Sequence, residues 1–279
     1  MPATVLVATP PVTAPLVAWL WCRTRKRALV IDCHTGAFHS WKWRWSLALL
    51  RFFARRATVA LAHTKEDEAE VRSWGSSALL LPDDVPRASD ASPRAPAENP
   101  RVVVAGSLDG NEPVEAVLAA ARLMPEVEVL LTGDTNRVPA RVRHTASTNA
   151  VFTGWLPYST FLGELLSAGA VAVFSTDPHI MNRAAFEAVG LGRPLVLSDL
   201  PAVRSRFGDA ALFAGNDPEA MAGAVRSALA QGQDLAAKST QLGERLRIQH
   251  QQALGRLRTL LDVGKAQPDA PVAAAEIAS

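Results

Sequence analysis

The feature that most constrains the fold is a regular alternation between short apolar runs and longer amphipathic runs along the whole chain. Each apolar run is bounded by turn or charged residues, which is typical of a buried strand. Strands that are almost continuously apolar and are separated by helices indicate a parallel sheet with both faces covered. We therefore expect an α/β protein of doubly wound parallel sheets.

The expected strands are Thr4–Ala8, Ala28–Ile31, Thr58–Ala62, Ala78–Leu81, Arg101–Ala105, Glu128–Leu131, Ala150–Phe152, Ala170–Phe174, Pro194–Leu197 and Ala210–Phe213. The expected helices are one that ends near Cys22, then Ser46–Ala54, Lys65–Trp74, Glu112–Leu123, Ser159–Ala168, Arg183–Val189, Pro218–Ala230 and Leu235–Leu261. A proline-rich stretch over residues 83–100 predicts a linker. It separates a domain over 1–82 from a larger domain over 101–262, and residues 263–279 are expected to form a disordered tail.

The charge is divided unevenly between these two parts. Arg23–Arg56 holds nine basic residues and one acid, a net charge of +8, so the rest of the +2 chain carries −6. Five of the seven tryptophans precede residue 46. The two cysteines form neither a disulfide framework nor a metal cluster, which favours a reducing, cytoplasmic location without a cofactor or metal.

The apolar N-terminal stretch, Ala3–Cys22, is not expected to be a targeting segment. Its basic residues follow the apolar run, whereas a cleavable signal has them before it. The prolines at Pro10, Pro11 and Pro15 would break a membrane-spanning helix.

Ligands of doubly wound sheets bind outside the carboxyl ends of the strands. Four such ends carry glycine or small polar residues, which let phosphate groups approach backbone N–H groups. The alternative interpretation is that glycine stands in these turns for structural reasons alone, because α/β folds need it there without any ligand. The candidate nucleotide-binding residues from these ends are Gly106, Ser107, Gly133, Asp134, Gly154, Trp155 and Leu156.

A more specific pattern runs from His179 to Asp199 and reads HIMNRAAFEAVGLGRPLVLSD. It resembles the donor-binding signature of family 4 (group 1) glycosyltransferases of the GT-B fold, and the similarity extends over about 101–230. The resemblance implies two Rossmann-like domains and a nucleotide-diphosphate sugar as donor. It implies that Glu187 accepts hydrogen bonds from the ribose hydroxyls. His179 stands where the family usually has a second glutamate that contacts the transferred sugar, and it is a candidate donor-binding residue together with Asn182 and Arg183. A solvated helix acid is the alternative interpretation of Glu187.

The loop over residues 106–113 departs from the family, which usually has arginine and lysine there to hold the diphosphate. This chain has no cation in that loop. Two functions therefore stay open: a sugar-transferring enzyme, and a non-catalytic donor-binding subunit that depends on a partner.

Asp32 and His34 follow the second expected strand in a motif that resembles the acceptor domain of the same superfamily. We assign them positioning or acid–base roles, against the alternative of a buried structural histidine. Retaining members of the family need no enzyme nucleophile, so the resemblance implies transfer with retention.

Alternating aromatic and basic residues follow this motif, at Trp41, Lys42, Trp43, Arg44 and Trp45. They suit a membrane surface that presents a lipid-linked acceptor, and suit nucleic acid less well because the larger domain is acidic. An ordinary amphipathic helix is the alternative.

About eighty residues precede the linker, fewer than in the acceptor domains of the family. The resemblance thus implies a truncated N-terminal domain whose exposed sheet edge is covered by a partner chain, a second copy or a membrane, or whose true start lies upstream.

Overall fold

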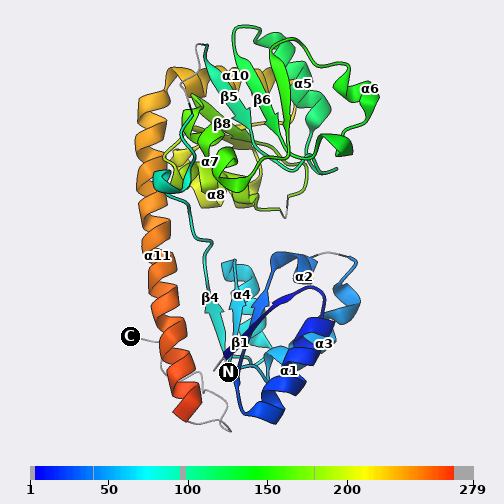
Figure 1. Ribbon diagram of the computed structural model, residues 1–279, viewed down its shortest axis with the longest axis vertical. Helices are drawn as coiled ribbons and strands as arrows, with labels where there is room; N and C mark the ends of the chain where they lie inside the picture. The colour runs from blue at the N-terminus through cyan, green and yellow to red at the C-terminus, as the bar shows by residue number, and fades with distance from the viewer. Residues whose placement is uncertain (1–3, 40, 95–98, 179, 267–279) are drawn as a thin grey trace. The chain divides into compact units, whose positions relative to one another are not determined.

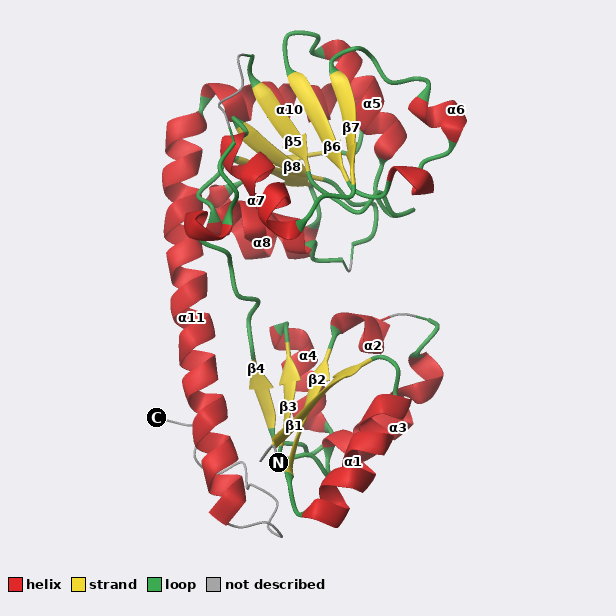
Figure 2. Cartoon of the chain, viewed as in Figure 1, coloured by secondary structure: helices red, strands yellow, loops and turns green. Residues whose placement is uncertain are grey.

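The structure is a computed structural model that describes residues 4–39, 41–94, 99–178 and 180–266. The chain divides into two compact units. The first unit comprises Met1–Asp83 together with Ile248–Ser279, and the second comprises Asp84–Arg247. Each unit has its own sheet, drawn in yellow in Figure 2.

The first unit has a four-stranded sheet in the order β1-β2-β3-β4, in which every neighbouring pair is parallel. The strands are β1 (Thr4–Thr9), β2 (Ala28–Cys33), β3 (Val59–Ala62) and β4 (Ala78–Leu80). The connecting helices are α1 (Thr13–Arg25), α2 (Thr35–His39), η1 (Arg44–Ser46), α3 (Leu47–Ala54) and α4 (Lys65–Ser73). Among the described strands the order never reverses, so the sheet is wound in one direction only.

The two faces of this sheet are covered differently. Residues on one face, including Ile31 and Ala60, pack with α1, α3 and α4. The opposite face is formed by Val30, Val59, Leu61 and Leu79 and packs against Leu257, Leu260 and Leu261 of α11 (Gly232–Ala266). The boundary expected at residue 262 therefore differs from the structure. From Ile248 onward the helix belongs to the first unit, because that unit's second face needs an apolar cover.

The second unit has a six-stranded parallel sheet in the order β10-β9-β8-β5-β6-β7. Its strands are β5 (Arg101–Val104), β6 (Glu128–Thr132), β7 (Ala150–Gly154), β8 (Ala170–Val173), β9 (Leu195–Ser198) and β10 (Leu212–Ala214). Successive strands run outward from β5 in one direction and from β8 in the other. This is a doubly wound arrangement, with its switch point between β5 and β8.

Helices follow the strands of this sheet, and Figure 1 shows α5 and α10 along the sheet with α7 and α8 nearby. Their bounds are α5 (Val114–Leu123), η3 (Thr135–Arg137), α6 (Ala140–Arg143), α7 (Tyr158–Ser167), α8 (Arg183–Gly190), α9 (Pro201–Phe207), η4 (Gly208–Ala210) and α10 (Pro218–Ala230). One core cluster lies on each face of the sheet, because alternate strand residues such as Val103 and Val102 point to opposite sides.

All ten expected strands are present, with ends shifted by at most a few residues. Thr64 caps α4, since its side chain accepts a hydrogen bond from the Asp67 N–H at 3.0 Å. The expected linker is partly folded. It contains η2 (Ala88–Asp90), and the Ser92 N–H donates to the Ser159 carbonyl at 2.8 Å. From Asp84 onward this segment is part of the second unit.

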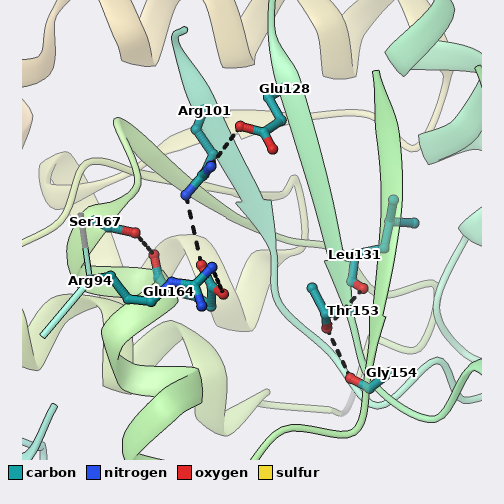
Figure 3. Close-up of polar contacts among 8 residues, drawn as sticks. All are labelled: Arg94, Arg101, Glu128, Leu131, Thr153, Gly154, Glu164 and Ser167. Atoms are coloured by element: carbon teal, nitrogen blue, oxygen red, sulfur yellow. Dashed lines mark hydrogen bonds and ion pairs between the residues drawn. The ribbon is translucent and has the colours of Figure 1, made fainter. Parts of the chain in front are cut away.

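A buried carboxylate ties that segment to the sheet. Glu164 of α7 pairs with Arg94 at 2.7 Å and lies 3.8 Å from Arg101, which in turn pairs with Glu128 at 2.8 Å (Figure 3). The Ser167 hydroxyl donates to the Glu164 carbonyl at 3.0 Å. The Glu164 side chain is almost fully buried, so these arginines rather than solvent surround its carboxylate.

Candidate functional site

The switch point of the second unit brings together the loops that leave β5 and β8. The backbone N–H of Thr176 donates to the Asn111 carbonyl at 2.8 Å, and the Thr176 hydroxyl donates to the same carbonyl at 3.1 Å. The Asn111 amide also reaches the Ser175 hydroxyl at 3.5 Å. Because ligands bind at such a switch point, these two loops form the candidate donor site.

Glu112 occupies the centre of the loop that leaves β5. Its carboxylate accepts hydrogen bonds from the N–H groups of Leu108 at 2.9 Å and Ser107 at 3.0 Å, and from the Ser107 hydroxyl at 3.1 Å. The same carboxylate lies against Gly106, where a Cβ atom would collide with it. Backbone N–H groups of this kind ordinarily bind an anion, and here an internal carboxylate holds them.

The loops after β5 and β6 touch at two expected residues. Gly133 has a φ of +125°, and a Cβ there would lie 2.7 Å from the Ser107 carbonyl carbon. The Asp134 N–H donates to the Ser107 carbonyl at 3.3 Å. Only glycine allows the two backbones to approach this closely. Gly133 therefore sets the distance between the loop after β6 and the loop that carries Ser107.

The carboxyl end of β7 lies beside them, where the Gly133 N–H donates to the Gly154 carbonyl at 3.4 Å. Thr153 donates from its hydroxyl to the Gly154 carbonyl at 2.9 Å and to the Leu131 carbonyl at 3.4 Å, as Figure 3 shows. Gly154 has a φ of +70° and open space around it. Trp155 is exposed and Leu156 is half-buried, so neither side chain is locked into the core.

The loop after β5 contains no cation, but Arg137, which follows β6, lies beside it. Arg137 forms ion pairs with Asp109 and, at 3.7 Å, with Asp134. It lies at a cavity of about 820 Å³ whose lining also includes Leu108, Glu112 and Val142. The cavity is thus bordered by three acids, Asp109, Glu112 and Glu115, and by one arginine that is already paired.

Glu187 is held on the second turn of α8 at the same edge of the sheet. Asn182 caps this helix by accepting from the Ala184 N–H at 2.9 Å. The Glu187 side chain is 6% exposed, and Arg183 donates to its Oε1 atom at 3.1 Å. Burial and then the charge of Glu187 raise the pKa of Tyr158, which keeps this phenol protonated.

Three of the residues expected around the donor thus lie close together: Arg183 and Glu187 are on α8, and Asn182 caps it. His179, the fourth, lies outside the described residues. Tyr158 and Glu112 were not anticipated. Tyr158 stands two residues after the expected site residue Leu156, which was the one sequence signal for it.

The first unit carries a second polar cluster at the carboxyl ends of β2 and β3. Asp32 Oδ1 lies 2.7 Å from His63 Nε2, and Asp32 Oδ2 lies 3.3 Å from His34 Nε2. The two imidazole rings stack with centroids 4.9 Å apart. His63 was missed by the sequence analysis, although it stands directly after the strand that neighbours β2.

The Asp32–His63 hydrogen bond is the main cause of a raised pKa of His63, and the charges of Asp32 and Asp83 add to it. Burial alone would raise the pKa of Asp32, but the hydrogen bond and charge of His63, with a contribution from His34, lower it. In this arrangement Asp32 stays ionised and His63 retains a proton more readily than an isolated imidazole.

The aromatic and basic stretch of the first unit is largely at the surface. Trp41 and Trp45 are 79% and 67% exposed, Trp43 is half-buried, and Lys42 and Arg44 are exposed. No helix of the described residues is long and apolar enough to cross a membrane.

Comparison with known families finds one match, over residues 99–231, to the family described as "Glycosyl transferases group 1". The matched segment contains the switch point, the loop with Glu112 and the whole of α8. Comparison with curated proteins finds no match.

Comparison with solved structures finds many similar folds. A sucrose-phosphate synthase from Thermosynechococcus elongatus is 19% identical, with a TM-score of 0.64 over 95% of this chain and 72% of that chain. HepE of Anabaena, in complex with UDP and glucose, is 17% identical, with a TM-score of 0.66 over 91% of this chain and 77% of that chain. The trehalose-6-phosphate synthase OtsA is 14% identical, with a TM-score of 0.65 over 92% of this chain and 71% of that chain.

Proposed function

Since residues 99–231 place this chain among the group 1 glycosyltransferases of the GT-B fold, we propose that it moves a sugar from a nucleotide-diphosphate donor to an acceptor. The second unit binds the donor at its switch point. The Anabaena protein of similar fold was solved with UDP and with UDP-glucose, which supports a nucleotide sugar as the ligand class.

The observation that carries this proposal is the position of Glu187. It is a nearly buried carboxylate on α8, at the sheet edge where doubly wound folds bind ligands, and its Oε1 atom is already oriented by Arg183. A carboxylate fixed in this way accepts hydrogen bonds from both hydroxyls of a ribose. Such charge-assisted hydrogen bonds are the stronger kind.

The acceptor belongs to the first unit in this proposal. Asp32 and His34 orient an acceptor hydroxyl, while the leaving diphosphate oxygen removes its proton on the same face, which gives transfer with retention. His63 joins them, because it holds Asp32 at hydrogen-bonding distance.

We further propose that the acceptor is lipid-linked and that the protein is cytoplasmic and docks peripherally on the membrane. Exposed tryptophans at Trp41 and Trp45 suit the interfacial layer, and Lys42 and Arg44 suit anionic headgroups. Nucleic acid is not part of the proposal.

A partner chain or second copy is proposed at the open edge of the first sheet. Among the described strands, β1 is an edge strand, and Leu6 on it is 60% exposed. Val17 of α1 is also exposed, at 66%. Exposed apolar side chains beside an unpaired strand are characteristic of an interaction surface.

A second candidate function is a donor-binding subunit without activity of its own. It is favoured by Glu112, which holds two backbone N–H groups that would otherwise be available to the diphosphate. An activity measurement distinguishes the two functions. The purified chain transfers sugar by itself if it is an enzyme, and transfer occurs only with an added partner if it is a donor-binding subunit.

The donor site is tested by calorimetry of the full chain with UDP, GDP and TDP. We expect one of the three to bind, and Glu187→Ala to weaken it by at least about tenfold, as for loss of a hydrogen bond to a charged group. The matched control is Glu219→Ala, an exposed acid of α10. Absence of binding by all three nucleotides would overturn the donor site.

Membrane docking is tested by flotation with vesicles that contain anionic lipid. The wild type is expected to float and the triple variant Trp41→Ala, Trp43→Ala, Trp45→Ala to remain in the dense fraction. The control is Trp155→Ala, an exposed tryptophan of the second unit. Equal flotation of the wild type and the triple variant contradicts docking by this surface.

A further inference from the structure

Three potential ligand atoms converge at the carboxyl edge of the first unit's sheet. A carboxylate oxygen of Asp32 and one ring nitrogen each from His34 and His63 all lie within 4.8 Å of one another. Two parallel neighbouring strands supply them: Asp32 and His34 come from the end of β2, and His63 follows β3. The cluster is therefore built by the sheet rather than by a single loop.

The spacing of these atoms fits a small divalent cation. With bonds of about 2.0–2.2 Å to nitrogen and oxygen, tetrahedral zinc separates its ligand atoms by about 3.3 Å. Here Asp32 Oδ2 and His34 Nε2 are 3.3 Å apart, and Asp32 Oδ1 and His63 Nε2 are 2.7 Å apart. The Asp32–His63 distance is that of a hydrogen bond, so a cation between these two atoms would replace its proton and move the atoms about 0.6 Å further apart.

The burial of the three side chains leaves one direction open. Asp32 and His63 are each 17% exposed, whereas His34 is 57% exposed. A cation here would have protein ligands on the inner side and a position for water or a substrate oxygen on the outer side. Three protein ligands and one open position are the pattern of catalytic zinc sites.

Asp83 is a fourth residue near this cluster, on the Nδ1 side of the His63 ring. Asp83 Oδ1 lies 3.8 Å from the Nδ1 atom of His63, which is buried and has no hydrogen-bond partner among the described residues. Pro82, next to Asp83, is fixed by its carbonyl contact with His250 Nδ1 at 2.7 Å. Metal-bound histidines usually donate their other ring N–H to a carboxylate, which turns the remaining nitrogen toward the metal. Asp83 is placed for that role.

We propose that Asp32, His34 and His63 form a divalent-cation site with the ligand preference of zinc, and that Asp83 orients His63 within it. Nitrogen and carboxylate donors in this ratio suit zinc better than magnesium or calcium, which take mainly oxygen ligands. The site lies wholly within the first unit, so it does not depend on nucleotide binding by the second.

The test uses the full chain without a histidine tag, treated with a chelator and then titrated with Zn²⁺ by calorimetry and with Co²⁺ by visible absorption. We expect one Zn²⁺ per chain and the intense absorption of four-coordinate Co²⁺, displaced by Zn²⁺. His34→Ala, in an exposed ligand that the fold tolerates, is expected to weaken Zn²⁺ binding at least about 100-fold. Asp83→Asn is expected to weaken it about 10–100-fold without changing the stoichiometry.

The control is His144→Ala, an exposed histidine of the second unit that is expected to bind Zn²⁺ as the wild type does. The thermal unfolding temperature of each metal-free variant shows whether it is folded. No stoichiometric Zn²⁺, or the same affinity in wild type and folded His34→Ala, overturns the proposal. UDP, GDP and TDP binding measured on the same samples reports separately on the donor site.

Discussion

Oε2 of Glu112 lies 2.9 Å from the backbone nitrogen of Leu108, in the loop that faces the switch point of the second sheet. A side chain thus makes the contact that an anionic ligand would make with this loop. Donor diphosphate and Glu112 compete for the same N–H groups if both are to bind there. This competition separates the two candidate functions more directly than the overall fold does.

Removal of the Glu112 carboxylate should strengthen anion binding. In Glu112→Ala the N–H groups of Ser107 and Leu108 lose their acceptor, and one negative charge leaves the site. We expect the affinity for the bound nucleoside diphosphate, or for pyrophosphate alone, to rise about tenfold, the value of one hydrogen bond to a charged group. Calorimetry at constant ionic strength measures the change.

Glu219→Ala removes an equal charge from α10, where the side chain is exposed, and should change the affinity less than Glu112→Ala does. If Glu112→Ala weakens anion binding, then Glu112 supports the loop for its ligand and does not compete with it.

Gly133 should be the least replaceable glycine of the site. Gly133→Ala combines a positive φ with a Cβ contact of 2.7 Å to the Ser107 backbone. We expect a loss of about 3 kcal/mol in the free energy of unfolding, from backbone strain together with overpacking. Gly154→Ala is the matched control, because its φ is also positive but its surroundings are open, and about 1 kcal/mol is expected. Equal losses in urea denaturation would contradict the packing argument.

The buried carboxylate of Glu164 should matter more than its partner Arg94. Glu164→Ala leaves the mostly buried Arg101 with one fewer counter-charge, and we expect about 3 kcal/mol of destabilisation. Arg94 is 43% exposed, so Arg94→Ala should cost less than about 1 kcal/mol. Urea denaturation of the two variants provides the comparison, and the reverse order would show that Arg94 carries the stability.

The leucines near the end of α11 should stabilise the first unit specifically. In the double variant Leu257→Ser, Leu261→Ser the sheet face formed by Val59 and Leu79 loses its cover. Hydrogen exchange of β3 and β4 should accelerate, while nucleotide binding by the second unit stays unchanged. Ile248→Ser, in an exposed residue of the same helix, is the control and should leave exchange as in the wild type. Unchanged exchange in the double variant would mean that α11 contributes little to this core.

The strands were predictable because their signal is local. Runs such as Val102–Ala105 and Ala170–Phe174 are apolar throughout, and the sheet buries both of their faces, so the pattern needs no tertiary information. Thr64 was predictable for the same reason, since a helix cap is decided within four residues. Glu187 was recognised from its surrounding motif, and its burial beside Arg183 agrees with a fixed rather than a solvated acid.

The contacts that define the candidate sites were not local and could not be predicted. His63 reaches Asp32 only because β2 and β3 are neighbours, and Tyr158 reaches Glu187 from a different helix. The role of Glu112 depends on a turn whose conformation its sequence leaves undetermined. α11 was expected to belong wholly to the donor domain. Its apolar positions do not reveal which sheet they cover, so the sequence could not show that its last part packs on the first unit.

The two-part composition of the first unit has a consequence for its synthesis on the ribosome. Its four strands are synthesised before the second unit, but Leu257, Leu260 and Leu261 are synthesised only after it. Until then one face of the nascent sheet is bare, and the usual order in which an N-terminal domain folds before the next is reversed. The second unit can complete its fold earlier. The first unit can complete its fold only after the last segment of α11 has been synthesised.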